Sequence, residues 1–275
     1  MTAAAMVASL APTATLKTLS ASVNQVFRLI EESGETSIIK VYSSPARERR
    51  ERHALEALAG VHGVPHIIER GSNDSMPWIK LTDGGVWNVA SLPKNLSVVR
   101  SCGQVLRAIH DSNANITNLD SGIDSEYVAT HFHSTLDRLE RYRRRLGMSA
   151  DVLEKAKHTS NTPIASAPVP SHTRPHPRNF LVNDRSEVSM IEWEYATLAP
   201  PEWDLSLATW RFSREIGEDA ATALWQGYGA SFPADRLLPW IAYHSSMMML
   251  EAAERRDGRL GDLSYLVDDL ARAVG

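Results

Sequence analysis

The 275-residue sequence predicts an α+β protein with two lobes, a small β-rich N-terminal lobe and a larger, mainly helical C-terminal lobe. Short β-rich runs separated by turn residues dominate up to about residue 81. Apolar residues at helical spacing dominate from about residue 97 onward, and only a short hairpin interrupts them. We therefore expect an N-terminal lobe over residues 1–81, a connection over 82–96 and a C-terminal lobe over 97–275.

The N-terminal lobe is expected to be a small sheet that carries one helix. The first residues are small and apolar, but no Lys or Arg precedes Lys17, so a secretion signal is not expected. Residues 23–30 and 37–42 are β-rich and flank a Gly-containing turn, which predicts a hairpin. Helical spacing follows over residues 46–63, and two further short strands are expected between residues 64 and 85.

The C-terminal part is expected to be helical on both sides of one hairpin. Residues 98–113 and 126–147 have helical patterns, whereas three prolines exclude a continuous helix over 161–170. Strand-like residues 180–182 and 188–191 flank a turn at Asn183 and Asp184, and the helical pattern returns from Leu205.

Composition and charge exclude several classes of protein. The net charge is −4 and the sequence pI is about 6.2, which argues against a general nucleic-acid binder. Cys102 is the only cysteine, so one chain can form neither a disulfide framework nor a cysteine-based zinc site. No apolar run approaches the roughly 18 residues of a membrane span. We expect a cytoplasmic protein that binds neither membrane nor nucleic acid.

The most polar segment, residues 171–204, is the candidate site. A loop rich in His, Arg and Asn precedes the short hairpin, and the acidic pair Glu192 and Glu194 follows it. Loops at the two ends of one hairpin can direct side chains into a common pocket. From the residues alone, a solvated connecting loop is an equally good interpretation.

The order of these motifs resembles the aminoglycoside phosphotransferase and choline kinase family, which has the protein-kinase-like fold. The family's catalytic loop, His-x-Asp-x-x-x-x-Asn, is similar to residues 172–179, HTRPHPRN, and its Ile-Asp-Trp-Glu segment to residues 191–194, IEWE. The resemblance covers nearly the full length in the expected order. It implies ATP or GTP and Mg²⁺ as cofactors, and a hydroxyl of a small molecule or peptide as acceptor.

The resemblance also implies a role for individual positions. Lys40 would contact the nucleotide phosphates, and Glu51 on the following helix would hold it. Residues 80–85 would be the hinge that meets the purine, with Leu81 and Asp83 on the cofactor side. The remaining implied positions are Asn179 and Glu192 as metal ligands and His172, Arg174 and His176 in the catalytic loop.

Two positions depart from the family pattern. Arg174 replaces the catalytic Asp, and a guanidinium, which has donors and no acceptor, cannot act as a general base. Glu192 replaces the metal-binding Asp, and its extra methylene moves the carboxylate about 1.5 Å farther from the backbone.

Three functions follow from these departures: a divergent phosphotransferase, a pseudokinase that serves as a nucleotide-binding or partner module, or a kinase fold with another reaction. A phosphotransferase without its base keeps positioning and charge neutralisation, which dominate phosphoryl transfer. The sequence leaves the acceptor and any partner protein open.

Three structural predictions can be checked directly. Lys40 and Glu51 should form an ion pair that faces the cleft. Asp204 should be structural, as a cap of the helix that follows Pro200-Pro201. Arg174 should lie at the floor of the cleft and either pair with Glu192 or face the open cleft.

Overall fold

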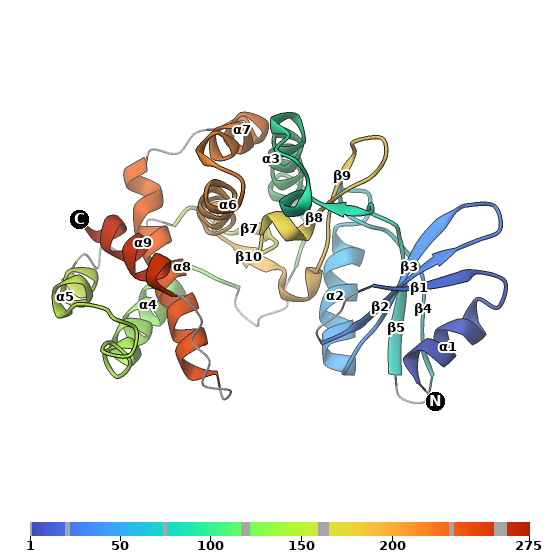
Figure 1. Cartoon of the computed structure of the whole chain (residues 1–275), viewed down its shortest axis with the longest axis horizontal. Helices are drawn as coiled ribbons and strands as arrows, with labels where there is room; N and C mark the ends of the chain where they lie inside the picture. Colours follow the sequence, from blue (N-terminus) through green and yellow to red (C-terminus); the bar gives the residue numbers. More distant parts are fainter. Residues whose placement is uncertain are drawn as a thin grey trace.

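The computed structural model describes residues 2–19, 23–73, 76–116, 122–158, 165–230, 234–255 and 263–275. It has the predicted α+β architecture, with an antiparallel sheet in one lobe and helices in the other (Figure 1). The N-terminus lies on the sheet lobe and the C-terminus on the helical lobe.

The N-terminal lobe is an antiparallel sheet in the order β1-β2-β3-β5-β4. Its strands are β1 (Thr15–Leu19), β2 (Gln25–Ile30), β3 (Thr36–Val41), β4 (Ile67–Asn73) and β5 (Met76–Thr82). Alternation along β3 places Ile39 and Val41 on one face and Ile38 and Lys40 on the other. Helix α2 (Pro45–Ala57) lies on the Lys40 face.

The opposite face of the sheet is covered by α1 (Ala3–Leu10), which the sequence did not predict. Met6 and Val7 of this helix pack against Phe27 and Ile39, and the Thr2 hydroxyl accepts a hydrogen bond from the Ala5 N–H at its start. The small apolar residues at the N-terminus are therefore core residues of this lobe.

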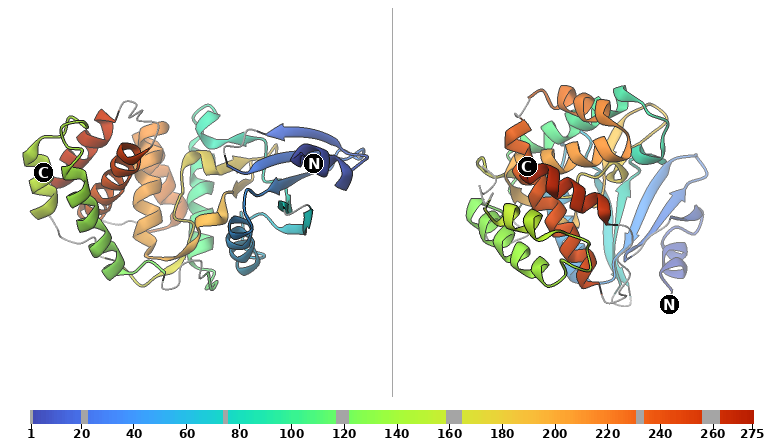
Figure 2. Two further views of the ribbon diagram at one scale, coloured as in Figure 1. Left: turned by 90° about the horizontal axis from the view of Figure 1, so that it is seen from below. Right: turned by 60° about the vertical axis from the view of Figure 1, so that its left-hand side comes forward.

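The C-terminal lobe contains seven helices in the described part of the chain, and Figure 2 shows them from two further sides. They are α3 (Leu96–His110), α4 (Ser125–Glu140), α5 (Ala150–His158), α6 (Pro201–Glu215), α7 (Glu218–Tyr228), α8 (Ala234–Glu254) and α9 (Ser264–Val274). Helices α3, α6 and α7 share a core with the hairpin, α2 and β5, while α4, α5, α8 and α9 form a second core.

Short strands carry the candidate site on the side of this lobe that faces the sheet. Strands β6 (Trp87–Asn88), β8 (Phe180–Val182) and β9 (Val188–Met190) form one ladder, and β7 (Val169–Ser171) pairs with β10 (Thr197–Ala199). The candidate loop runs between β7 and β8, and the acidic pair follows β9.

Some element boundaries differ from the sequence prediction. Strand β1 and helix α5 were not predicted, and α6 begins at Pro201, before Leu205. Helix α4 ends at Glu140, and residues 141–147 form turns closed by Gly147 with a φ of +68°. The prediction for residues 161–170 falls partly outside the described residues. No described helix is both long and apolar enough to cross a bilayer.

Candidate active site

Lys40 is the centre of a buried charge cluster between the lobes. Its Nζ lies 2.7 Å from Glu51 Oε2 on α2 and 3.1 Å from Glu192 Oε2, and only 4% of its side chain is exposed. Burial alone would lower the pKa of Lys40, but the two carboxylates outweigh burial and the net pKa is raised. The predicted Lys40–Glu51 ion pair is confirmed, and the ammonium stays charged.

His172 lies beneath the cleft and does not line it. Its Nδ1 accepts a hydrogen bond from the Arg174 N–H at 3.2 Å, and its Nε2 donates to the Ile191 carbonyl at 2.8 Å. The ring packs edge-on against Trp193, and burial lowers its pKa, so the imidazole is neutral. His172 therefore connects the loop of residues 172–179 to the segment that carries Glu192, and its buried side chain has no surface for a ligand.

Asp204 fixes the backbone of the same loop from α6. Its Oδ2 accepts from the His172 N–H at 2.7 Å, and its Oδ1 from the Thr173 N–H at 2.8 Å. These bonds hold Thr173 at a φ of +66°, a region that non-glycine residues rarely adopt. The predicted helix cap is wrong, because the carboxylate is turned away from its own helix, whose N-cap is Pro200. Asp204 therefore has a structural role, but it stabilises the loop at His172 and Thr173 and not the start of its own helix.

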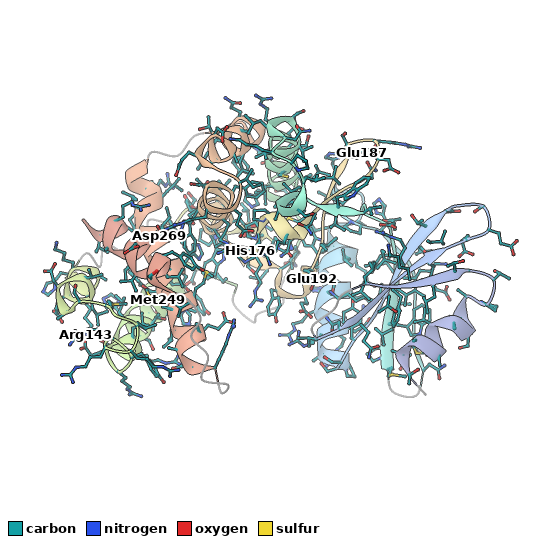
Figure 3. The ribbon with its side chains drawn as sticks, viewed as in Figure 1. Arg143, His176, Glu187, Glu192, Met249 and Asp269 are labelled. Atoms are coloured by element: carbon teal, nitrogen blue, oxygen red, sulfur yellow. The ribbon has the colours of Figure 1, made fainter. Side chains whose placement is uncertain are left out.

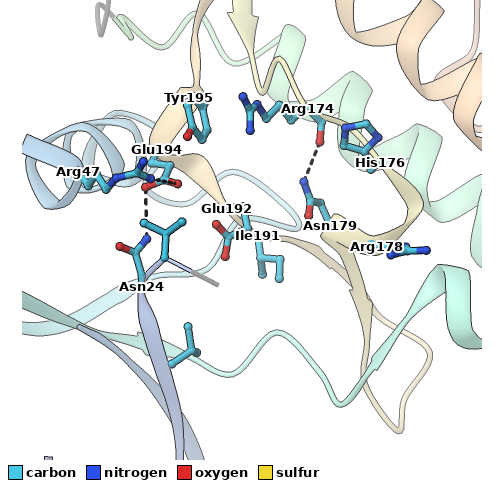
Figure 4. A pocket seen from close by; sticks show the side chains of 12 residues that line it. Asn24, Arg47, Arg174, His176, Arg178, Asn179, Ile191, Glu192, Glu194 and Tyr195 are labelled. Atoms are coloured by element: carbon cyan, nitrogen blue, oxygen red, sulfur yellow. Dashed lines mark hydrogen bonds and ion pairs between the residues drawn. The ribbon is translucent and has the colours of Figure 1, made fainter. Parts of the chain in front are cut away.

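Arg174 faces the open cleft. Its guanidinium stacks over the Tyr195 ring at 3.7 Å, and no acidic partner is found for it in the described part of the chain (Figure 4). Of the two predicted arrangements, pairing with Glu192 does not occur, because Glu192 is paired with Lys40. Arg174 is thus a cation on the cavity wall that has no acidic partner among the described residues.

Asn179 and Glu192 offer the donor set of a magnesium site. The Asn179 Nδ2 donates to the Arg174 carbonyl at 2.9 Å, which leaves the amide oxygen for a ligand. Glu192 has a φ of +73° and a side chain that is 40% exposed, and both residues line the same cavity. Mg²⁺ prefers oxygen ligands and is held by one or two protein groups together with substrate phosphates, so these residues fit it.

The cavity between the lobes has a volume of about 610 Å³ and is lined by side chains from both lobes (Figure 4). Figure 3 shows His176 and Glu192 on the side of the helical lobe that faces the sheet. Among the lining residues to which the sequence analysis gave no role, four are polar or aromatic: Asn24, Arg47, Arg178 and Tyr195. Glu194 joins the lobes here, because its carboxylate accepts from Arg47 at 2.9 Å and from Asn24 at 3.3 Å. Arg47 has no local signal, since it is one of several arginines in the sequence ARERR.

His176 lines this cavity as well. Its Nδ1 is buried without a hydrogen-bond partner in the protein. Burial, followed by the charges of Arg211 and the neighbouring His172 and Arg174, lowers its pKa to about 3. A neutral imidazole with so low a pKa is a hydrogen-bonding group and a poor proton acceptor at neutral pH.

Leu81 and Asp83, the two expected purine contacts, do not line the cavity. Leu81 is buried in the shared core, and the Asp83 carboxylate is bound by Arg28 with an N–O distance of 2.6 Å. Of the nine candidate residues, the cavity brings together Arg174, His176, Asn179 and Glu192. Lys40 and Glu51 join them through Glu192.

Comparisons with known proteins identify the family and the fold of the chain. The model of the phosphotransferase enzyme family matches residues 15–240. No curated protein matches the sequence significantly. Among solved structures, spectinomycin phosphotransferase APH(9)-Ia with ADP and spectinomycin has 14% identity and a TM-score of 0.65, covering 98% of each chain.

Two other solved structures share the fold. The macrolide 2'-phosphotransferase MphH from Brachybacterium faecium has 18% identity and a TM-score of 0.63, covering 94% of this chain and 91% of its own. A mutant aminoglycoside 2'-phosphotransferase IIIa with GDP has 14% identity and a TM-score of 0.73, covering 99% and 97%. At these identities the likeness shows the kinase-like fold.

Proposed function

Because the chain belongs to the phosphotransferase enzyme family, we propose that it transfers the terminal phosphoryl group of a nucleoside triphosphate, ATP or GTP, to a hydroxyl group of a small molecule. One observation carries this proposal. The Arg174 guanidinium, which has no acidic partner among the described residues, lines the same cavity as Glu192 and Asn179, and Glu192 connects this cavity to the buried Lys40–Glu51 pair.

The chemistry follows from which groups can take a proton. The acceptor oxygen bonds to the terminal phosphorus, and the bond from phosphorus to the bridging oxygen breaks, which releases a nucleoside diphosphate. Arg174 has no acceptor atom, His176 is a poor base, and Lys40 binds the Glu192 carboxylate while Arg47 and Asn24 bind that of Glu194, so the hydroxyl proton leaves to a phosphoryl oxygen or to water. The absence of a carboxylate base lowers the rate by about 10²–10⁴-fold relative to a site that has one.

Arg174 then contributes by binding the transferred group. Its planar guanidinium, held on Tyr195, can donate two parallel hydrogen bonds to phosphate oxygens. Asn179 and Glu192 would hold Mg²⁺, which neutralises phosphate charge when bound. Lys40 is held by Glu51, and its ammonium offsets part of the negative charge of Glu51 and Glu192 beside the bound phosphates.

The second candidate function is a pseudokinase that binds a nucleotide or a partner without transfer. It is favoured by one observation, the arginine at the catalytic carboxylate position. The two functions differ in whether a phosphorylated product forms, so a direct product assay separates them.

The test is phosphate transfer from ATP or GTP with Mg²⁺ to a panel of hydroxyl compounds, followed by mass spectrometry. We expect Arg174→Ala to lower the rate by about 10-fold or more, since it removes a charged phosphate contact. Arg185→Ala, which alters an exposed arginine of the β8–β9 turn, is the matched control and should leave the rate unchanged. A rate that rises in Arg174→Asp while Arg174→Ala stays at the wild-type level would contradict the role of the arginine. Nucleotide binding with no product from any variant would favour the pseudokinase.

A further inference from the structure

The half of the cleft that would receive a purine is filled by the protein's own side chains. Arg28 of β2 lies opposite Ile38 of β3, which is two residues before Lys40, so Arg28 and Lys40 share the face of the sheet that looks into the cleft. Only 7% of Arg28 is exposed. It therefore stands over the segment 80–85 that the family resemblance assigns to the base.

Arg28 binds this segment at three points. Its Nε donates to Asp83 Oδ2 at 2.6 Å, and its Nη2 donates to Asp83 Oδ1 at 3.0 Å and to the Gly85 carbonyl at 2.7 Å. The Arg28–Asp83 pair is thus bidentate, and both side chains are buried. Arg28 thus occupies the Asp83 carboxylate and the Gly85 carbonyl, two of the polar groups that this segment could offer to a purine.

The same segment is pressed against the hairpin of the other lobe. A Cβ at Gly84 would lie 2.9 Å from Ser189 Cβ, and one at Gly85 would overlap the Val182 carbonyl. The Val86 N–H also donates to the Val182 carbonyl at 3.1 Å. The segment and the hairpin are therefore in direct contact at Gly84 and Gly85.

The open cavity lies elsewhere, toward the phosphate side of the cleft. On the N-terminal lobe it reaches Val26, and no residue of 80–85 lines it. Its lining contains the cations Arg47, Arg174 and Arg178, of which Arg174 has no acidic partner within the described ranges. The unpartnered Nδ1 of His176 also belongs to this wall.

We propose that the protein has a phosphate compartment but no open purine compartment. It would then recognise an oligophosphate chain by its charge, and a purine base would add nothing to the binding affinity. This inference rests on the phosphate-binding part of the proposed function. Inorganic tripolyphosphate and the triphosphate of a nucleotide share this chemistry. A purine enters the cleft only if Arg28 releases Asp83, which would leave a buried carboxylate without its counter-charge.

Titration calorimetry with tripolyphosphate, ATP, GTP and adenosine, each with Mg²⁺, tests the proposal on the full chain. We expect dissociation constants for the first three that agree within about 3-fold, and no binding of adenosine. Arg174→Ala should weaken all three phosphate ligands to a similar extent. ATP that binds about 10-fold or more tightly than tripolyphosphate, or Arg174→Ala that leaves tripolyphosphate binding intact, would overturn the proposal.

A double variant, Arg28→Val with Asp83→Asn, opens the purine compartment without leaving an unpaired charge. Val suits a strand, and the Asn oxygen can keep the bond from the Gly85 N–H. We expect ATP to bind about 10-fold or more tightly in this variant, with tripolyphosphate unchanged. Arg70→Val, at an exposed arginine of β4, is the control that should change neither. A folded double variant whose affinity for ATP is unchanged would contradict the proposal that Arg28 and Asp83 close the purine compartment.

These measurements are made at equilibrium and do not require transfer. If no phosphorylated product forms, the proposed function is wrong. The ratio of the affinities for ATP and tripolyphosphate still tests whether the purine compartment is closed. Conversely, the protein could transfer phosphate and also bind ATP much more tightly than tripolyphosphate. That result would support the proposed function and contradict the proposal that the purine compartment is closed.

Discussion

Lys40 and Arg174 represent two ways in which this chain handles a positive charge at the cleft. Lys40 is buried and shares its charge with Glu51 and Glu192, whereas Arg174 is exposed and rests on an aromatic ring. A buried charge depends on its partners, because an unpaired ion in the interior is strongly unfavourable. The exposed arginine has no such constraint and is available to a ligand.

Replacing Lys40 alone should therefore destabilise the protein. In Lys40→Met, Glu51 loses its counter-charge while only 2% exposed, and we expect the free energy of unfolding to fall by about 3–5 kcal/mol. The double variant Lys40→Met with Glu51→Leu should recover most of this loss, because no buried charge is left unpaired. Urea unfolding of the two variants measures both values. Equal losses in the single and double variants would show that the pair is not the source of the effect.

Asp204 allows a corresponding test for the loop of residues 172–179. Asp204→Asn replaces one acceptor oxygen with an NH₂ group opposite a backbone N–H, and we expect a loss of about 1–3 kcal/mol in unfolding free energy. Asp184→Asn, at an exposed position of the hairpin turn, is the control. An unchanged melting temperature in Asp204→Asn together with lost ligand binding would mean that the carboxylate acts on the ligand and not on the loop.

At the scale of elements, two glycines let α3 and α7 pack at close range. A Cβ at Gly227 of α7 would overlap the Arg100 carbonyl of α3, and one at Gly103 of α3 would overlap the Leu224 carbonyl of α7. Neither glycine has a positive φ, so the space between the helices is the constraint. These helices share the core under the β8–β9 hairpin, and their spacing supports the floor of the cleft.

Gly227→Ala should separate the two helices. We expect a decrease of about 1–3 kcal/mol in the free energy of unfolding, because a rigid backbone carbonyl cannot move aside for the new methyl group. Thermal or urea unfolding measures the change. Gln104→Ala, on the exposed face of α3, is the matched control and should have little effect. A Gly227→Ala protein as stable as the control would contradict the close approach.

At the scale of the whole molecule, buried neutral histidines link stability to pH. His244 of α8 lies among the aromatic rings of Trp203, Trp240 and Tyr243, and burial lowers its pKa from 6.5 to about 4. In the unfolded chain the His244 ring is protonated as the pH falls below about 6.5, whereas in the folded protein the ring stays neutral down to about pH 4. The stabilisation from the neutral ring is therefore fully present above about pH 6.5 and is lost as the pH falls toward 4.

Urea unfolding between about pH 7.5 and about pH 4.5 should show this decrease in the free energy of unfolding. Below about pH 6.5 each such histidine contributes a slope of about 1.4 kcal/mol per pH unit. His244→Gln should reduce the slope, whereas His133→Gln, on the exposed face of α4, should not. A slope that is the same in wild type and His244→Gln would show that His244 does not titrate as its burial implies.

Local patterns in the sequence accounted for the architecture, and the family resemblance for one ion pair of the site. The β2–β3 hairpin and helix α3 follow from periodicities of 2 and 3.6 residues over short windows, which side-chain burial imposes within one element. The Lys40–Glu51 pair was predicted from the family resemblance, since a lysine on a strand and a glutamate on the next helix have no local signal of their own, and the structure confirms it. The motif order from residue 172 to 204 likewise indicated the family.

Tertiary structure alone decided which polar groups are available to a ligand. Arg28 and Asp83 are 55 residues apart, and no local sequence pattern indicates that the two side chains form an ion pair. Asp204 has the spacing of a helix cap, yet it binds the backbone of a loop 31 and 32 residues earlier. His172 has its two ring nitrogens occupied by groups that meet only in the folded chain. Periodicity reports which face of an element is buried, but a hydrogen bond or ion pair depends on where a distant segment arrives, and that is set by the packing of the two lobes together.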